Sequence, residues 1–285
     1  MLRWYGYVGL LMIAFAQLNF FMVLQPFAEW YIPIVWYGYI LFVDSMVYRL
    51  KKQSLISTYP REFLFIAAIS LPFWLIFEAY NLFTNSWYYV NYMWYVHIVD
   101  FTTIMPAVLE TFTLVRVLRI AEYSSLGGFH SMMGRKVMGT RSTVRHEMAL
   151  KALPLLGILS CAVPLIDPYF GFPFVWLGLF LLLDPINYMM GRPSLIKRYS
   201  QGERGLPVQL FIAGIVMGFF WEFWNYMAYA KWIYVIPAGL PNIRLFEMPI
   251  YGYLGYLPFA LDVFLFYALA RSFFFKHRIP LLDIN

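Results

Sequence analysis

Residues 33–56 read PIVWYGYILFVDSMVYRLKKQSLI, and residues 173–196 read PFVWLGLFLLLDPINYMMGRPSLI. Ten of the 24 aligned positions are identical without a gap, and they include a proline, a glycine, an aspartate and a serine. Shared apolar character cannot explain matches of these residue types, so the two stretches indicate an internal duplication. The polar and conformationally special identities are Pro33/Pro173, Gly38/Gly178, Asp44/Asp184 and Ser54/Ser194.

The match continues along the chain and divides it into two halves. Three further correspondences follow in the same order: Glu78-x-x-Asn81 with Glu222-x-x-Asn225, Trp87 with Trp232, and Pro106-x-x-x-Glu110 with Pro258-x-x-x-Asp262. The predicted organisation is a first four-helix repeat over residues 1–118, a basic linker over 119–151, a second four-helix repeat over 152–275 and a tail over 276–285.

The composition indicates an integral membrane protein. Hydrophobic residues make up 62% of the 285 residues and charged residues 13%, whereas soluble domains contain about 45–50% apolar and about 25% charged residues. We therefore expect an all-α polytopic protein with about eight transmembrane helices. The predicted spans are residues 7–25, 31–49, 62–83, 96–118, 152–168, 172–190, 206–228 and 248–271. Four spans in each repeat make the two repeats parallel, with sites expected between them.

The loops alternate in charge along the chain. The 21 lysines and arginines exceed the 15 acidic residues to give a net charge of +6, and nearly all of these bases fall in the loops on one side. The positive-inside rule makes that side cytoplasmic, with both termini on it. We therefore expect location in a bacterial or archaeal plasma membrane. The bases are too scattered to predict binding of nucleic acid.

Polar residues inside the apolar spans mark the candidate sites, because a charge at the bilayer centre costs at least about 2.5–3.5 kcal/mol. The helical rise predicts an outer layer that contains Glu78, Asn81, Asp100, Glu222 and Asn225. It also predicts an inner layer that contains Asp44, Asp184, Glu110 and Asp262. We expect the outer layer to be functional, with interhelical hydrogen bonding as its alternative role. We expect the inner layer to pair with nearby arginines and to lock the repeats together.

The outer layer is unequal in the two halves. Glu78 and Asn81 share one helix face, as do Glu222 and Asn225, so each amide is placed to orient a carboxyl group. A buried carboxyl that stays protonated can donate its proton. At the height of Asp100, the second half has no acid and offers Tyr251 and Gly252 instead.

The sequence contains no signature of a metal site or of a nucleotide cofactor. Its single cysteine, Cys161, lies in an apolar run and is expected to be a small packing residue. Ligand clusters for haem, iron or zinc, phosphate loops and dinucleotide fingerprints are all missing from the sequence. We therefore expect no metal and no cofactor.

Residues 219–270 carry a pattern of aromatic and acidic residues. The pattern consists of Phe220-Trp221-Glu222, Trp232-Ile233-Tyr234, Arg244-Leu245 and Met248-Pro249-Ile250-Tyr251-Gly252-Tyr253. It resembles the membrane-embedded lycopene cyclase domain of the heterodimer or fused type, which acts in carotenoid biosynthesis. The first half contains a fainter echo in Phe77-Glu78, Trp87-Tyr88-Tyr89 and Asp100. Where the family has a pair of acids, this chain has Tyr251 and Gly252.

The resemblance implies redox-neutral acid–base chemistry on an isoprenoid, of the cyclase or hydratase kind. It implies acid–base roles for Glu78, Asp100 and Glu222, and substrate-binding roles for Asn81, Asn225, Trp221 and Tyr251. The expected partner is a membrane lipid or isoprenoid, with a second copy of the chain or a membrane complex as further partners. Two other functions stay open: a proton-coupled transporter or channel for a small solute, and a structural subunit of a membrane complex.

Overall fold

The computed structural model describes residues 1–120, 140–201, 203–276 and 280–283. Most of the predicted basic linker, residues 121–139, lies outside the described residues, as does part of the predicted tail. Among the described residues, six helical stretches are long and apolar enough to cross a membrane, as expected for an all-α membrane protein. They are α1 (Trp4–Met22), α2 (Tyr31–Lys51), α4 (Pro60–Thr84), α5 with α6 (Trp94–Phe101 and Ile104–Val117), α11 (Gly205–Met227), and η2 with α12 (Ile250–Gly255 and Tyr256–Phe274).

The two remaining predicted spans correspond to shorter apolar stretches. They are Leu150–Ile166, within α8 (Thr140–Ile166), and α9 (Pro173–Met189). The predicted fourth span is interrupted, because Thr102 and Thr103 separate α5 from α6, two residues after Asp100. The predicted eighth span begins as the 3-10 helix η2 and continues directly into α12.

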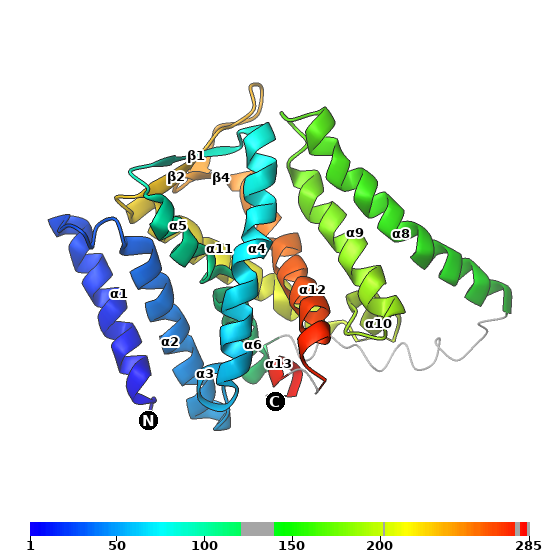
Figure 1. Cartoon of the computed structure of the whole chain (residues 1–285), viewed down its shortest axis with the longest axis horizontal. Helices are drawn as coiled ribbons and strands as arrows, with labels where there is room; N and C mark the ends of the chain where they lie inside the picture. Colours follow the sequence, from blue (N-terminus) through cyan, green and yellow to red (C-terminus); the bar gives the residue numbers. More distant parts are fainter. Residues whose placement is uncertain (121–139, 202, 277–279, 284–285) are drawn as a thin grey trace.

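The helices form a row with a central group and two flanking pairs (Figure 1). The centre contains α4, α6, α11 and α12, with α1 and α2 on one side and α8 and α9 on the other. Strands β1 (Trp87–Val90) and β2 (Lys231–Tyr234) lie across one end of the central helices, at the top of Figure 1, which we name the sheet end. The opposite end, which we name the α3 end, carries α3 (Leu55–Thr58), α10 (Leu195–Ser200) and α13 (Pro280–Asp283).

The flanking pairs are held together by the same glycine contact. A Cβ atom added to Gly9 in α1 would lie 2.4 Å from the carbonyl oxygen of Gly38 in α2. Added to Gly157 in α8, it would lie 2.8 Å from the carbonyl oxygen of Gly178 in α9. Small residues let membrane helices approach closely enough for their backbones to pack. Gly38 and Gly178 are matched positions of the two aligned stretches.

The two aligned stretches share an aspartate and, ten residues later, the tripeptide Ser-Leu-Ile, and the structure explains why both recur. Asp44 accepts hydrogen bonds from the Ser54 hydroxyl at 2.9 Å and from the Ile56 amide at 2.8 Å. Asp184 accepts from the amides of Leu195 and Ile196, each at 2.8 Å. Each aspartate thus satisfies the free amides at the start of a short helix, α3 or α10.

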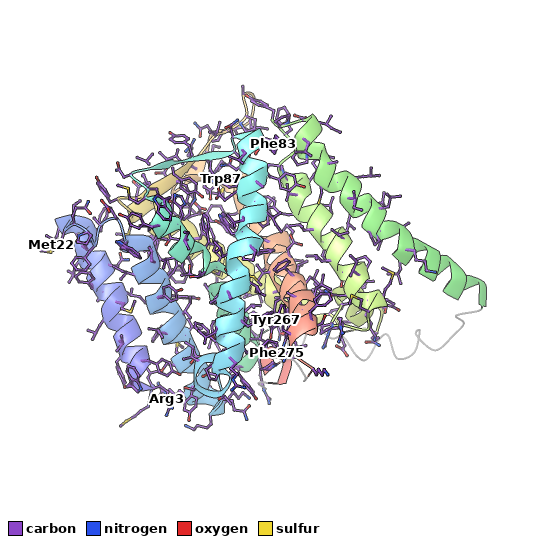
Figure 2. The ribbon with its side chains drawn as sticks, in the orientation of Figure 1. Arg3, Met22, Phe83, Trp87, Tyr267 and Phe275 are labelled. Atoms are coloured by element: carbon purple, nitrogen blue, oxygen red, sulfur yellow. The ribbon has the colours of Figure 1, made fainter. Side chains whose placement is uncertain are left out.

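The predicted arginine pairing of the inner layer is wrong. Asp44 and Asp184 bind the helix starts just described, while Glu110 and Asp262 have no hydrogen-bond partner among the described residues. The buried arginine pair is instead Arg271 with Glu62, at 2.6 Å, which joins α12 to α4. Tyr267, labelled in Figure 2, also donates to Glu62, at 2.5 Å. Glu62 could not be recognised from the sequence, because its partners lie more than 200 residues away in the chain.

The sheet end is closed by a strand from each half of the chain. Strands β1 and β2 are antiparallel, with Trp87 opposite Tyr234 and Tyr89 opposite Trp232. A second small sheet pairs β3 (Arg244–Leu245) with β4 (Met248–Pro249). Because alternate strand residues point to the same side, the two tryptophans and two tyrosines of β1 and β2 share one face.

Candidate binding cavity

Two asparagines fix the strands that cover the sheet end. The Asn81 side chain donates to the Trp87 carbonyl at 3.0 Å and accepts from the Trp87 amide at 3.1 Å. The Asn225 side chain makes the same two bonds to Trp232, at 2.9 and 3.0 Å. The asparagines therefore hold β1 and β2, whereas the sequence analysis assigned them to the carboxyl groups and to substrate.

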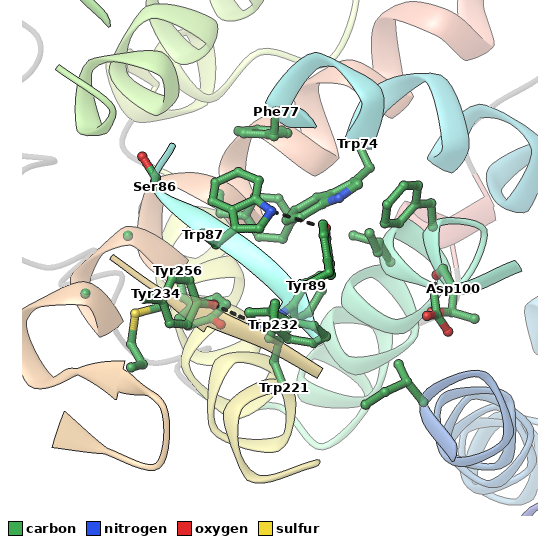
Figure 3. A pocket seen from close by; sticks show the side chains of 18 of the residues that line it. Trp74, Phe77, Ser86, Trp87, Tyr89, Asp100, Trp221, Trp232, Tyr234 and Tyr256 are labelled. Carbon is green, nitrogen blue, oxygen red and sulfur yellow. Dashed lines mark hydrogen bonds between the residues drawn. The ribbon is translucent and has the colours of Figure 1, made fainter. Parts of the chain in front are cut away.

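Beneath the sheet lies a cavity of about 150 Å³ with mainly aromatic walls (Figure 3). Strand residues Trp87, Tyr89, Trp232 and Tyr234 line it. Its helical walls include Trp36, Trp74, Phe77, Phe101, Trp176, Trp221, Tyr256 and Phe259. Such walls favour an apolar ligand, with the few polar groups fixing its orientation.

Asp100 is the one carboxylate among the described residues that line this cavity. It lies near the end of α5 and is only 5% exposed. Its Oδ2 atom accepts a hydrogen bond from the Tyr92 hydroxyl, while its buried Oδ1 atom has no partner among the described residues. A buried polar atom without a partner is uncommon and calls for an explanation, such as an absent ligand or water.

Glu78 and Glu222 do not line the cavity, and tyrosines lie between them and it. The Tyr89 hydroxyl donates to Glu78. Glu222 Oε1 accepts from the hydroxyls of Tyr234 at 2.8 Å and Tyr256 at 2.6 Å. All three tyrosines line the cavity. The two glutamates therefore contact tyrosines that line the cavity and do not line it themselves.

The second donor to each glutamate comes from a different place in the two halves. Trp74, four residues before Glu78, donates to it through Nε1 at 2.8 Å. The residue four before Glu222 is Gly218, and a Cβ atom there would lie 2.4 Å from the Tyr256 ring. Because Gly218 has no side chain, the Tyr256 ring fits beside it and its hydroxyl donates to Glu222. Each glutamate keeps two aromatic donors, although the residues that supply the second one differ.

The strand tyrosines remain hydrogen-bond donors at neutral pH. Burial raises the pKa of the Tyr89 and Tyr234 hydroxyls well above the ordinary value of 10.0, and the adjacent glutamates raise it further. Each hydroxyl also accepts from the indole nitrogen two residues earlier in its strand, Trp87 at 3.2 Å and Trp232 at 2.8 Å (Figure 3). The two strands therefore present the same tryptophan–tyrosine unit.

Of the residues predicted to bind substrate, Trp221 lines the cavity and Tyr251 does not. Tyr251 is 39% exposed, and its neighbour Gly252 lines the cavity. Gly252 takes the position of Asp100 when Pro106 is aligned with Pro258, and a Cβ atom there would lie 2.3 Å from the Met248 sulfur. The second half thus places a methionine where the first half has an acid.

Four tyrosines of this site are not among the predicted site residues: Tyr89, Tyr92, Tyr234 and Tyr256. A signal for two of them was present, because Trp-x-Tyr recurs at residues 87–89 and 232–234. Both tyrosines belong to the aromatic pattern quoted above, which assigns them no role. In both halves a tryptophan and a tyrosine two residues apart follow the matched Glu-x-x-Asn, and this recurring spacing could have identified the tyrosines.

Comparison with known proteins found no match among family profiles, curated proteins or solved structures. The resemblance to the lycopene cyclase domain therefore stays a prediction.

Proposed function

We propose that the cavity binds one end of a long isoprenoid- or carotenoid-like lipid and that Asp100 performs redox-neutral acid–base chemistry on it. The observation that carries this proposal is the buried Oδ1 atom of Asp100, which has no hydrogen-bond partner among the described residues and belongs to a mainly aromatic wall. An apolar ligand suits the rings, and a reacting double bond beside Oδ1 accounts for the acid.

The cavity volume limits how much of the ligand reacts at one time. A cavity of about 150 Å³ holds a group about the size of benzene, whereas drug-sized ligands occupy about 300–1,000 Å³. One terminal isoprene unit or ring therefore enters, and the rest of the chain extends toward the bilayer. Asp100 serves that single end, because the matched position in the second half is Gly252.

In the proposed reaction, the protonated Oδ1 of Asp100 donates its proton to a terminal carbon–carbon double bond. The double bond supplies the electron pair for the new C–H bond, and a tertiary carbocation remains. The faces of Trp74, Trp221 and Trp232 stabilise this cation through their ring quadrupoles. Attack by a second double bond closes a ring, and a neighbouring C–H returns its proton to Asp100. Capture of water is the hydratase variant of the same step.

Tyr92 and the strand tyrosines support Asp100 in this scheme. Tyr92 donates to Oδ2, so the proton resides on Oδ1 and points toward the ligand. Tyr89 and Tyr234 present hydroxyls to the cavity while Glu78 and Glu222 hold them. We assign the two glutamates as positioning residues and Asp100 as the catalytic acid.

The finer architecture belongs to the same proposal. We infer that the chain is two parallel four-helix repeats with eight spans, and that the α3 end faces the cytoplasm of a bacterial or archaeal cell. Three pairs of matched residues make equivalent contacts in the two halves, which supports the repeats. They are Gly38 and Gly178, Asp44 and Asp184, and Asn81 and Asn225. The bases near α3 and α10 support the orientation.

The test is incubation of the purified protein with linear polyene isoprenoids, followed by solvent extraction and mass spectrometry. The wild type should yield a product of unchanged mass, or heavier by one water, and Asp100→Asn should yield none. Asp262→Asn is the matched control, because it changes an equally buried aspartate that does not line the cavity. Unaltered substrate, together with no isoprenoid retained by the wild type, would contradict the proposal.

A further inference from the structure

The cavity reaches from one flanking helix pair to the other. Its wall includes Ile32 and Trp36 from α2. It also includes Phe172, which directly precedes α9, and Trp176 within α9. Helices α2 and α9 lie on opposite sides of the central group (Figure 1). Trp36 matches Trp176 in the aligned stretches, and the same register continued by one residue matches Ile32 with Phe172. The cavity therefore has two related ends, which we name the α2 end and the α9 end.

The two ends differ in burial, and always in the same direction. Four pairs of matched residues line the cavity, each with a buried member in the first half and a half-buried member in the second: Ile32 and Phe172, Trp36 and Trp176, Asp100 and Gly252, and Thr103 and Gly255. Asp100 belongs to the α2 end, because its helix α5 packs against α2. The acid thus lies at the closed end of the cavity, and the α9 end reaches the surface of the molecule.

A hydrogen bond holds the α2 end together and has no counterpart at the α9 end. The hydroxyl oxygens of Tyr37 in α2 and of Thr102, two residues after Asp100, lie 2.5 Å apart. The same alignments place Leu177 at the position of Tyr37 and Leu254 at the position of Thr102. Leucine side chains have no hydrogen-bonding group, and these two are 46% and 66% exposed. The bond that ties α2 to the segment carrying the acid therefore cannot form between the matched residues of the second half.

Two glycines make the wall of the α9 end apolar. A Cβ atom added to Gly252 would lie 2.3 Å from the Met248 sulfur, and one added to Gly255 would lie 2.7 Å from Cη2 of Trp176. Met248 and Trp176 therefore occupy the space that side chains at the glycines would need. A thioether and an indole face give a lining that suits a hydrocarbon chain.

The sheet side of Asp100 is filled by aromatic rings. The Tyr92 hydroxyl donates to Asp100. The centroid of the His97 ring lies 4.0 Å from that of Tyr92 and 4.2 Å from that of Tyr89. Rings in such close contact leave no room for a chain between them. A ligand whose end is at Asp100 therefore has to extend toward the α9 end.

We propose that the isoprenoid chain enters and leaves the cavity at the α9 end. Its terminal unit lies at Asp100, and the following units extend past Phe172 and Trp176 into the bilayer. This inference rests on the proposed function, because it concerns the same ligand. It adds a direction: the second half of the chain forms the opening, and the first half supplies the acid.

The experiment measures the reaction of single cysteines with an apolar maleimide, in the full chain purified in detergent with Cys161→Ser. Phe172→Cys and Ile32→Cys change matched wall positions. Phe172→Cys should react fast and lose most of its reactivity when a linear polyene isoprenoid is added. Ile32→Cys should react slowly with or without the isoprenoid. Phe174→Cys is the control, because Phe174 is 42% exposed and does not line the cavity; it should react fast in both conditions.

The occupant is identified by adding phosphatidylcholine in place of the isoprenoid, and retained isoprenoid is measured in each sample by extraction and mass spectrometry. Equal protection of Phe172→Cys by phosphatidylcholine would make a phospholipid acyl chain the occupant and overturn the proposal. Retained isoprenoid without protection would place the exit elsewhere, although the proposed function would stand. No retained isoprenoid would contradict both. Faster reaction of Ile32→Cys than of Phe172→Cys would place the opening at the α2 end.

A second measurement on the wild-type chain decides if a cysteine variant fails to fold. An isoprenoid with a diazirine in the middle of its chain should label the peptide that contains Trp176, and excess unmodified isoprenoid should abolish the label. The matched peptide that contains Trp36 should stay unlabelled. Competitor-sensitive labelling of the Trp36 peptide in place of the Trp176 peptide would overturn the proposal.

Discussion

At the scale of single residues, the two glutamates of the outer layer show how a site can be conserved in chemistry while its residues change. Glu78 takes its donors from Trp74 and Tyr89, and Glu222 takes its donors from Tyr234 and Tyr256. Because a buried carboxyl without donors is costly, the loss of the tryptophan at Gly218 is offset by the tyrosine that fills its space. The requirement is therefore for two donors, whatever their source.

Removal of one of these donors should destabilise the protein. Tyr234→Phe leaves Glu222, which is fully buried, with a single donor, and we expect a loss of about 1–3 kcal/mol in the free energy of unfolding. Tyr251→Phe changes an exposed ring outside the cavity and should stay within about 0.5 kcal/mol of the wild type. Thermal unfolding in one detergent measures both. Equal stability of the two variants would mean that the hydroxyl bond to Glu222 has no structural value.

The same tyrosines predict a dependence of stability on alkaline pH. The pKa of Tyr89 and Tyr234 lies well above 10.0 in the folded protein because of burial and the adjacent glutamates, and near 10 in the unfolded chain. Above about pH 10 the unfolded chain releases these protons while the folded protein keeps them. Their stabilising contribution is thus complete below pH 10 and decreases as the pH rises above it. Denaturation between pH 8 and pH 11 should give a flatter profile for Tyr234→Phe, and parallel profiles would contradict this account.

At the scale of helices and strands, much of the layout could be predicted from sequence. The duplicated Asp44 and Asp184 were recognised as matched, although not as ligands of the amides that begin α3 and α10. That role depends on the turns by which the chain folds back from α2 to α3 and from α9 to α10, and the spacing of apolar residues does not predict such turns. The break between α5 and α6 was also missed, since Thr102 and Thr103 interrupt no apolar pattern. The pairing of β1 with β2 was missed because it joins segments more than 140 residues apart.

The glycine contact of α8 with α9 should be essential for that pair. Gly157→Val adds side-chain atoms where even a Cβ atom lies 2.8 Å from the Gly178 carbonyl oxygen. Overpacking of this kind costs about 1–3 kcal/mol, and the two helices should separate. Leu156→Val is the control, because it introduces the same residue at a position that is 51% exposed. Thermal unfolding of both variants checks the expectation; a Gly157→Val protein as stable as its control would show that the helices do not depend on close approach.

At the scale of the whole molecule, the sheet of β1 and β2 joins the two halves of the chain, and residues of both strands line the cavity. Each half supplies one strand, one asparagine that hydrogen-bonds to that strand, and one Trp-x-Tyr unit. Composition alone predicted the membrane and the helices, and the duplication predicted which residues would correspond. Neither could predict that the two glutamates contact tyrosines of the cavity wall, because that contact depends on how β1 and β2 pair over the helices. The acid nearest the cavity, Asp100, was nevertheless among the predicted residues.

The arrangement also predicts which ends share one face of the membrane. The N-terminus and α13 lie at the α3 end, and Tyr88 of β1 lies at the sheet end and is 52% exposed. Reporter fusions at the N-terminus and after Asp283 should therefore both report the cytoplasm, and a cysteine-reactive label should reach Tyr88→Cys only from outside. Wild-type Cys161 is replaced by serine in this experiment. Opposite signals from the two fusions would contradict an even number of spans.

The central claim is that an apolar chain end enters the aromatic cavity beside Asp100. Photocrosslinking with an isoprenoid that carries a diazirine at one end tests it most directly, with the labelled peptides identified by mass spectrometry. The account predicts labels on the peptides that contain Tyr92, Trp221 and Trp232, and loss of those labels when excess unmodified isoprenoid is present. Labels confined to the exposed faces of α1 and α8, unaffected by competitor, would contradict it.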